Sequence, residues 1–267
     1  NTGVRTWDCE LSTIDTALLF AGIIDARQYF DTNDANDVLI RNLADSILHR
    51  ANWDAMRNFN PGIMMGWKPG GGFNGFGQWI GYSEASIMYL IALGSPTHPV
   101  PNASPNSWAA WTSGYQWGTY YGYSFVTCPP LFTHQYSACW VDFRDKWDAY
   151  MQAKGITYFE NSRRATLAQQ AYCIANPLSR TGYSATLWGL TASDGPFGYN
   201  ARGTPPAQND DGTIAPTAAA GSIVFAPEIV LPTLQNMYNS YNATLWGAYG
   251  FKDAFHLGLN WWDTDYL

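Results

Sequence analysis

Segments with the apolar spacing of helices alternate along this chain with long loops rich in glycine and aromatic residues. The spacing predicts a short helix from Ser104 or Asn106 and longer helices over residues 12–30, about 37–56, 83–93, 137–154, 162–175 and 227–241. Residues 115–136, where aromatic and small residues alternate, predict one or two short strands or an extended loop. Because paired helices are separated by long loops, we expect an all-α toroid with its aromatic loops on one face, in a single domain over residues 1–267.

The predicted helices also indicate which faces should be buried. Ser12 followed by Asp15 resembles a capping box and would begin the first helix. The second helix has an apolar face, expected to be buried, that consists of Val38, Leu39, Leu43, Ile47 and Leu48. Cys173 lies on an apolar helical face and is expected in the core. The four cysteines are widely spaced, so the sequence indicates neither a zinc site nor a disulfide framework.

Aromatic residues make up 16% of the chain, and many stand beside Gly and Asn in the loops. Flat rings offer platforms for the C–H faces of sugars, so this composition indicates carbohydrate binding. The net charge of −7, without any Lys/Arg run, argues against nucleic acid and anionic membranes as partners. No apolar run reaches the roughly 18 residues of a transmembrane helix. The chain begins without Met and shows no signal peptide, as a processed product does, and we expect a periplasmic or secreted monomer.

The stretch Gly62–Pro99 is the part of the sequence that most strongly suggests a function. It begins as a loop rich in glycine and aromatic residues and runs into a helix start that carries Glu84. The loop supplies Trp67, Lys68, Phe73, Phe76, Trp79 and Tyr82. Ordering so many glycines costs backbone entropy, and this combination is typical of a groove that stacks sugars and performs acid–base chemistry. The alternative is a surface loop with a few aromatic side chains packed into the core.

The chain has four glutamates, and two of them have a simple structural explanation. Glu160 and Glu228 stand at predicted helix starts, where the helix dipole favours a negative charge. Glu84 stands between an aromatic loop and an apolar helix. Such surroundings raise a carboxyl pKa, as a general acid requires, although helix capping would also explain the residue.

Further candidates lie near the start of the chain and in the aromatic segment LFTHQY. Asp8 and Glu10 are two residues apart on an extended segment, so both side chains can point the same way, whereas Asp15 is explained by capping. Glycosidic hydrolysis uses two carboxyl groups, whose separation decides between inversion and retention. His134 fits substrate contact and a structural hydrogen bond equally well. The sequence has no zincin, serine-hydrolase or P-loop motif, and we expect neither a metal nor a cofactor.

Several stretches together resemble one family and cover nearly the whole chain in order. They include ELSTIDTALLFAGI, YSEASIMYLIALGSPTHP, PLFTHQYSACWVDFRD, LWGLTASDGPFGYNARGTPP and LWGAYGFKDAFHLGLNWWDTDYL. They resemble bacterial glucoamylase-like proteins, which include endo-β-1,2-glucanases and a domain of cyclic β-1,2-glucan synthases. The resemblance implies an (α/α)6 toroid with the site in its central cavity, and metal-independent hydrolysis of β-glucans. It also implies that Glu84 is the leading catalytic candidate and that Glu10, Asp15 and Asp8 line the same cavity.

Two departures from the family pattern modify these expectations. Relatives carry more helices before the first matching segment and a further segment after NWWxTDYL, so we expect a partial toroid that is incomplete at both ends. Relatives often carry a further His where this chain has Ala138, so the local hydrogen bonding is expected to differ.

The resulting hypothesis is a glycoside hydrolase that cleaves β-glucan, with β-1,2-glucan as the first substrate to test. Glu84 would be the general acid and Glu10 or Asp8 its partner, with Asp263 and Asp194 as further candidates. The stacking platforms would be Trp67, Phe73, Trp79, Tyr199, Trp261 and Trp262. Other contacts with the saccharide would come from Lys68, Tyr82, His134, Arg144, Asp194, Arg202 and Asp263. The alternatives are a non-catalytic glucan-binding domain and a transglycosylase that acts on β-1,2-glucan.

Overall fold

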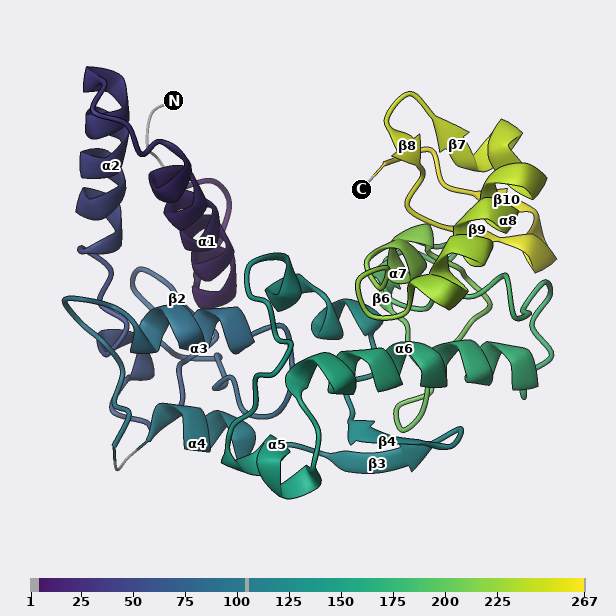
Figure 1. Cartoon of the computed structure of the whole chain (residues 1–267), viewed down its shortest axis with the longest axis horizontal. Coiled ribbons are helices and arrows are strands. Elements are labelled where there is room, and N and C mark those ends of the chain that lie inside the picture. The colour runs from purple at the N-terminus through teal and green to yellow at the C-terminus, as the bar shows by residue number, and fades with distance from the viewer. Residues whose placement is uncertain (1–4, 104–105, 267) are drawn as a thin grey trace. The chain divides into compact units, whose positions relative to one another are not determined.

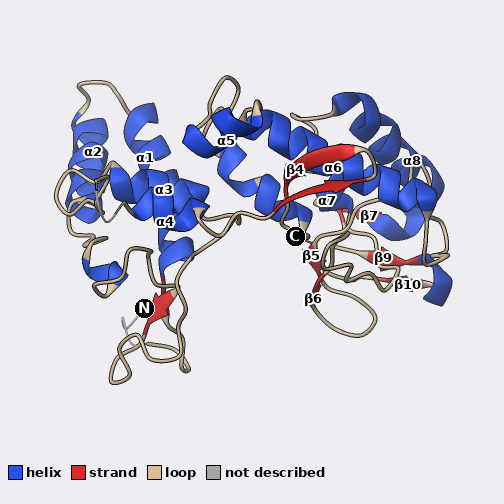
Figure 2. Cartoon of the chain, turned by 90° about the horizontal axis from the view of Figure 1, so that it is seen from below, coloured by secondary structure: helices blue, strands red, loops and turns tan. Residues whose placement is uncertain are grey.

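A computed structural model describes residues 5–103 and 106–266 (Figures 1 and 2). The chain divides into two compact units, residues 1–115 and residues 116–267. The regular secondary structure of the described residues is mainly helical in both units, with short strands, which confirms the expected all-α class (Figure 2). Because compact units also occur as parts of one domain, the single domain over residues 1–267 stays a prediction.

The described part of the first unit is built from four helices and a short pair of strands. The helices are α1 (Thr13–Tyr29), α2 (Ala35–Leu48), α3 (Ser86–Leu93) and α4 (Ser107–Thr112). Strand β1 (Leu11–Ser12) pairs antiparallel with β2 (Gly66–Trp67). Ser12 Oγ accepts a hydrogen bond from the Asp15 N–H at 3.3 Å, so the predicted cap of α1 is confirmed.

Two helix boundaries in this unit differ from the prediction. The expected helix to residue 56 is wrong beyond Leu48, where α2 ends. Asn52 Oδ1 accepts a hydrogen bond from the Ala55 N–H at 2.9 Å, so a polar side chain begins a separate 3-10 turn over Ala55–Arg57. Helix α4 begins behind Asn106, whose side chain caps it. The alternative start at Ser104 lies outside the described residues.

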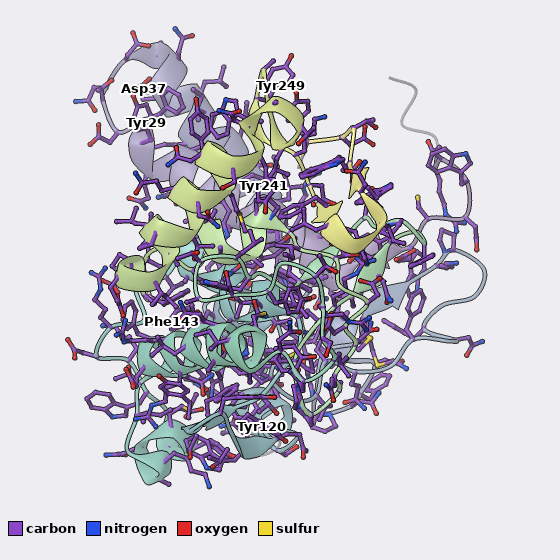
Figure 3. All side chains as sticks on the ribbon, turned by 90° about the vertical axis from the view of Figure 1, so that its right-hand side faces the viewer. Tyr29, Asp37, Tyr120, Phe143, Tyr241 and Tyr249 are labelled. Carbon is purple, nitrogen blue, oxygen red and sulfur yellow. The ribbon has the colours of Figure 1, made fainter. Side chains whose placement is uncertain are left out.

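The apolar face of α2 is not buried within its unit. Between 36% and 55% of the residue surface is exposed at Val38, Leu39, Leu43 and Ile47. The predicted burial of this face is therefore wrong, because an apolar stripe shows which side of a helix can be buried but supplies no partner for it. Helix α1 contacts α2 through an ion pair, Arg27 Nε to Asp45 Oδ1 at 2.6 Å. Figure 3 shows Tyr29 and Asp37 near the turn that joins the two helices.

The core of the first unit connects α3 to the aromatic loop. Tyr89 of α3 is fully buried and stacks on Trp111 of α4, with ring centroids 5.4 Å apart. The Tyr89 hydroxyl accepts a hydrogen bond from the Ile63 N–H at 3.1 Å and donates one to the Trp79 carbonyl at 2.7 Å. One buried side chain therefore fixes both ends of the loop between residues 63 and 79.

The described part of the second unit contains four helices, a hairpin and short strand pairs. The helices are α5 (Ala149–Lys154), α6 (Tyr158–Ala175), α7 (Pro216–Ala220) and α8 (Pro227–Leu245). The hairpin consists of β3 (Trp117–Tyr120) and β4 (Tyr123–Val126), which confirms the strands predicted between residues 115 and 136. The two-residue pairs are β5 (Ala192–Ser193) with β6 (Asn200–Ala201), β7 (Trp246–Gly247) with β8 (Gly250–Phe251), and β9 (Phe255–His256) with β10 (Trp261–Trp262). Short 3-10 turns lie at Leu131–His134, Tyr136–Cys139 and Leu257–Leu259.

Only part of the helix predicted over residues 137–154 exists. Residues 140–148 are irregular between the 3-10 turn Tyr136–Cys139 and α5. Asp145 has a positive φ of 54°, which a helix cannot continue through, and Asp148 Oδ1 accepts from the Met151 N–H at 2.8 Å to begin α5 afresh. The helices predicted over residues 162–175 and 227–241 are confirmed as parts of α6 and α8.

The core of the second unit forms around α6. Cys173 is fully buried there, as predicted, beside Tyr172 and Trp188. Phe255 of β9 stacks on Trp262 of β10 with centroids 5.3 Å apart and an interplanar angle of 8°. Tyr241 of α8, labelled in Figure 3, lies 5.6 Å from Trp262 by ring centroids. Within residues 5–103 and 106–266, no helix has the length and apolar character needed to cross a membrane.

Candidate active site

The β1–β2 pair brings the start of α1 against the aromatic loop. Leu11 lies opposite Trp67, and Ser12 lies opposite Gly66. The approach is close: a Cβ atom on Gly66 would lie 2.8 Å from Phe76 Cε1 and 3.1 Å from Glu10 Cγ. The predicted acid Glu10 therefore lies beside the aromatic loop because glycine permits the contact.

Asp8 also contacts the loop, through an ion pair. Lys68 Nζ lies 2.5 Å from Asp8 Oδ2, and Arg5 Nη2 lies 2.5 Å from Asp8 Oδ1. The hydrogen bond from Lys68 and then that from Arg5 lower the pKa of Asp8, whose side chain stays largely exposed. Asp8 is thus an accessible carboxylate that is ionised at neutral pH. Lys68, predicted to bind sugar hydroxyls, also fixes this acid.

Trp79 is anchored by the first residue of α1. Its indole Nε1 donates a hydrogen bond to Thr13 Oγ1 at 3.1 Å, and the buried Thr13 hydroxyl donates to the Met64 carbonyl at 2.8 Å. Trp67, Phe73 and Trp79 remain half-buried and can present part of their rings. Tyr82 is also half-buried, and it stacks on Trp111 with ring centroids 6.2 Å apart, so one face of its ring is covered.

Glu84 lies in a turn two residues before α3. The helix begins at Ser86 behind Ala85, so the predicted place of Glu84 in the first turn of the helix is wrong, and Glu84 lies before the helix. The side chain is partly buried. This burial chiefly raises the pKa of Glu84, and the charge of Asp15 raises it further. Glu84 therefore has the property that a general acid needs, namely a carboxyl group that keeps its proton to higher pH than usual.

The first unit therefore groups all four predicted catalytic acids with the loop. Asp15 is exposed in the first turn of α1 and lies close enough to Glu84 to affect its pKa. Glu10 is exposed beside Gly66, and Asp8 is bound to Lys68. The arrangement offers one carboxyl group with a raised pKa and three accessible carboxyl groups as partners, which is the combination of groups that glycoside hydrolysis uses.

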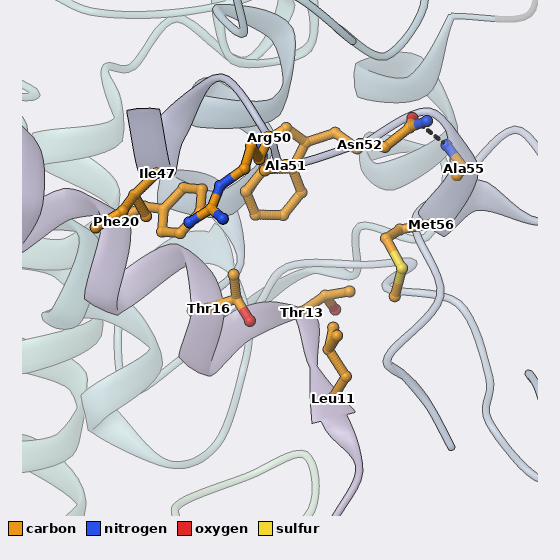
Figure 4. A pocket seen from close by; sticks show the side chains of 11 residues that line it. Leu11, Thr13, Thr16, Phe20, Ile47, Arg50, Ala51, Asn52, Ala55 and Met56 are labelled. Atoms are coloured by element: carbon orange, nitrogen blue, oxygen red, sulfur yellow. Dashed lines mark hydrogen bonds between the residues drawn. The ribbon is translucent and has the colours of Figure 1, made fainter. Parts of the chain in front are cut away.

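A separate pocket of about 400 Å³ lies between α1 and the segment that follows α2 (Figure 4). Its lining includes Leu11, Thr16, Phe20, Ile47, Arg50 and Met56. In the described part of the chain the lining is mainly apolar and contains none of the predicted acids. This pocket therefore lacks the carboxyl groups that sugar hydrolysis requires.

Two predicted saccharide contacts of the second unit are buried. Arg202 is only 1% exposed, and its guanidinium donates to both oxygens of Asp211 at 2.8 and 2.9 Å. It also donates to the backbone carbonyls of Ser193 and Asp194. Burial would raise the pKa of Asp211, but the bonds from Arg202 and Thr213 outweigh it and lower that pKa to about 2. The predicted contact between Arg202 and sugar is wrong, because its donors are already used inside the unit.

His134 also lies inside the second unit. It is 4% exposed, and burial lowers the pKa of its imidazole to about 3. Its Nδ1 lies 3.5 Å from Asn161 Nδ2, and its carbonyl accepts from Ser162 Oγ at 2.9 Å. Of the two alternatives open from the sequence, the structure supports the structural histidine, and the substrate contact is not retained.

The other predicted residues of the second unit vary in accessibility. Tyr199 is exposed, and Trp261 is half-buried. Trp262 has one face covered by Phe255, which leaves less of the ring for a sugar. Arg144 is exposed, pairs with Asp142 at 3.4 Å and lies over the Phe159 ring.

Asp194 and Asp263 lie together with a third acid that the sequence did not suggest. Asp253 accepts a hydrogen bond from the Asp194 N–H at 2.7 Å, and carboxylate oxygens of Asp194, Asp253 and Asp263 all lie within 4.8 Å of one another. Asp263 is 6% exposed, so it does not present its carboxyl group to solvent. Burial raises the pKa of Asp253, and the charges of Asp263 and Asp194 raise it further. Asp253 stands alone in GFKDAFH, where no motif or spacing marks it.

Comparisons with known proteins show which proteins this chain resembles. A curated relative, the exo β-1,2-glucooligosaccharide sophorohydrolase (non-reducing end) of Parabacteroides distasonis, is 32% identical over 93% of this chain and 37% of its own length. A "putative glucoamylase" from Bacteroides uniformis has a TM-score of 0.89 and 33% identity over 96% of this chain and 62% of its own. The endo-β-1,2-glucanase of Chitinophaga pinensis, solved with sophorotriose and glucose, has a TM-score of 0.87 and 28% identity over the same shares.

The chain spans less than two thirds of the length of each of these relatives. A family model matches residues 77–267, which is most of the chain and includes Glu84. On this match the chain belongs to the Glycoamylase family, described as "Putative glucoamylase".

Proposed function

We propose that this chain carries the catalytic carboxyl groups of a glycoside hydrolase that cleaves β-1,2-glucan. The observation that supports this most directly is Glu84, a partly buried carboxyl with a raised pKa at the end of an aromatic loop. The reaction needs an acid that protonates the glycosidic oxygen as the bond breaks. The names of the sophorohydrolase and the endo-β-1,2-glucanase support β-1,2-linked glucose as the substrate.

The second carboxyl group is proposed to come from the segment before and within the first turn of α1. Asp8 is held ionised by Lys68 and Arg5, as a base or nucleophile must be. Glu10 lies against the loop at Gly66, and Asp15 is the acid whose charge reaches Glu84. Substituting each acid separately by its amide decides among the three.

The saccharide is proposed to lie along the aromatic loop. Trp67, Phe73 and Trp79 are half-buried there, and the bond from Trp79 to Thr13 fixes one ring in place. A ring held before binding loses little freedom when a sugar stacks on it. Lys68 then contributes by orienting Asp8.

The finer features of the architecture belong to the same proposal. An (α/α)6 toroid is proposed because the sequence resembles the glucoamylase-like proteins and because helices predominate in the regular structure of the described residues. A saccharide as the partner, a periplasmic or secreted location and a monomeric state are proposed with it.

The test is incubation of the purified chain with linear β-1,2-glucan, followed by chromatography of the products. We expect short oligosaccharides from the unaltered chain and a loss of about 100-fold or more in rate for Glu84→Gln, since general acids contribute about this much. Glu228→Gln is the matched control. It makes the same chemical change at a surface acid that pairs with Arg163.

Several outcomes would contradict the proposal. Equal rates for Glu84→Gln and the unaltered chain would exclude Glu84 as the acid. Binding of the glucan without cleavage would indicate a binding domain, and products longer than the substrate would indicate a transglycosylase.

The early products also distinguish the mode of cleavage. Sophorose as the sole early product would indicate exo cleavage, whereas a ladder of oligosaccharides would indicate endo cleavage.

A further inference from the structure

Three acids from two parts of the sequence meet inside the second unit. Asp194 follows β5, Asp253 lies between β8 and β9, and Asp263 follows β10. One carboxylate oxygen from each lies within 4.8 Å of the others. Asp253 and Asp263 are only 7% and 6% exposed, so two of these acids are removed from water.

The hydrogen bonds of the cluster leave two of its oxygens unsatisfied. Asp253 Oδ2 accepts from the Asp194 N–H at 2.7 Å, and Asp263 Oδ1 accepts from the Asp265 N–H at 3.0 Å. The other oxygens, Asp253 Oδ1 and Asp263 Oδ2, are buried and have no donor among residues 5–103 and 106–266. A carboxylate oxygen buried without a partner is costly, and two such oxygens in one acidic cluster indicate a cation that binds both.

Nearby positive charge does not replace such a cation. The nearest guanidinium, that of Arg202, gives both of its forked bonds to Asp211 and contacts Asp194 through the backbone carbonyl. The two buried oxygens, Asp253 Oδ1 and Asp263 Oδ2, therefore receive no hydrogen bond from this guanidinium or from any other donor in the described part of the chain.

We propose that Asp194, Asp253 and Asp263 bind a calcium ion that ties the β5–β6 segment to the β9–β10 pair. Carboxylate oxygens suit a hard cation. Two of the three acids are buried. A site built from protein oxygens away from water suits calcium, whereas magnesium gives up its water reluctantly and usually keeps several water ligands. The sequence did not lead us to expect this site. The ion would stabilise the fold and take no part in the reaction, so the proposed hydrolysis stays metal-independent.

The test uses the purified chain after removal of metals with EDTA. Calcium chloride is then titrated in a calorimeter, and Tm is measured with and without it. We expect one ion per chain, and a rise in Tm of about 5–10 °C when calcium is at about 100 times its Kd. Magnesium chloride should give a smaller rise. Neither readout depends on glucan cleavage.

Variants locate the ion. Asp253→Asn and Asp194→Asn should each lose the heat of calcium binding and the rise in Tm. Asp194 is the more accessible acid, so its variant carries the test if the buried one fails to fold. Asp145→Asn is the control, because this exposed residue lies outside the cluster and has a positive φ that Asn tolerates.

Two results would overturn the assignment. In the first, the unaltered chain shows no heat of calcium binding and no change in Tm, and Asp253→Asn raises Tm with or without calcium. The acids would then share protons and bind no ion. If Asp194→Asn and Asp253→Asn bind calcium as tightly as the unaltered chain, the ion lies elsewhere.

Discussion

Lys68 Nζ lies 2.5 Å from Asp8 Oδ2, across 60 residues of sequence. This ion pair connects the segment before α1 to the aromatic loop that ends at Glu84. The ion pair lowers the pKa of Asp8, whereas burial raises the pKa of Glu84. The two carboxyl groups are therefore shifted in opposite directions. Opposite shifts of this kind separate the roles of acid and base in glycoside hydrolysis.

Lys68→Met is expected to raise the pKa of Asp8 toward its ordinary value. The hydrogen bond from Lys68 is the largest cause of the lowered pKa, and Arg5 would remain to supply part of the effect. The measurement is an NMR titration of the Asp8 carboxyl carbon. Lys146→Met serves as the control, because Lys146 is exposed and has no ion pair among the described residues. An unchanged Asp8 titration would show that the ion pair does not exist in solution.

Glu84→Gln should stabilise the chain at neutral pH and not in acid. A carboxyl whose pKa is raised by folding binds its proton more tightly in the native state than in the unfolded state. Native stability is therefore lost as the pH rises from the ordinary Glu pKa through the raised one. The amide cannot ionise and escapes this loss. We expect Tm of the variant to exceed that of the unaltered chain at about pH 7 and to match it at about pH 4.

Glu228→Gln provides the control with the opposite sign. The bond from Arg163 chiefly lowers the pKa of Glu228, so its stabilising effect is present above the ordinary Glu pKa and is lost in acid. The variant should lower Tm slightly at neutral pH, because the pair is exposed. The same direction of change for both variants would refute the burial argument for Glu84.

The candidate site could be predicted as far as residue types and local context specify it. Glu84 stood out because its sequence neighbours are an aromatic loop and an apolar helix, and its side chain is partly buried in the structure. The exact start of α3 was missed because Ser83 Oγ accepts from the Ala85 N–H at 3.3 Å and shapes a turn before the helix. Short polar side chains form such turns as readily as caps, and sequence does not choose between them.

Contacts between distant segments were beyond the sequence. Arg202 was predicted to contact the saccharide, because the sequence does not show that a loop residue nine positions on, Asp211, takes its forked donors. Asp253 was missed because its hydrogen-bond partner, the Asp194 N–H, lies 59 residues away in the sequence. The apolar stripe of α2 predicted a buried side, but whether a partner covers it is decided by the rest of the fold.

Arg202→Met is expected to lower the free energy of unfolding by about 3–5 kcal/mol, because it leaves a partly buried carboxylate without its partner. Arg202 is 1% exposed and Asp211 loses two direct bonds. Arg202→Lys should recover only part of the loss, since an ammonium group cannot form the fork. Urea unfolding measures both. Arg144→Met, at an exposed pair with Asp142, should change the free energy of unfolding by less than about 1 kcal/mol.

Gly66→Ala tests whether the close approach of loop and acid matters for activity. The added Cβ would meet Phe76 Cε1 at 2.8 Å and Glu10 Cγ at 3.1 Å, so the ring and the acid must both move. We expect a stability loss of about 1–3 kcal/mol from overpacking. We also expect at least a roughly tenfold fall in the rate of β-1,2-glucan cleavage, because small displacements of catalytic groups are costly. Gly71→Ala is the control, since a Cβ there meets nothing within 4 Å.

A second substitution tests the cause of the loss. Adding Phe76→Leu to Gly66→Ala should restore Tm, because the smaller side chain makes room for the new Cβ. The double variant should restore the rate only if Glu10 returns to its place. If Tm recovers and the rate does not, the loss of activity comes either from displaced Glu10 or from removal of the Phe76 ring. The single variant Phe76→Leu separates these two causes, because it removes the ring without moving Glu10.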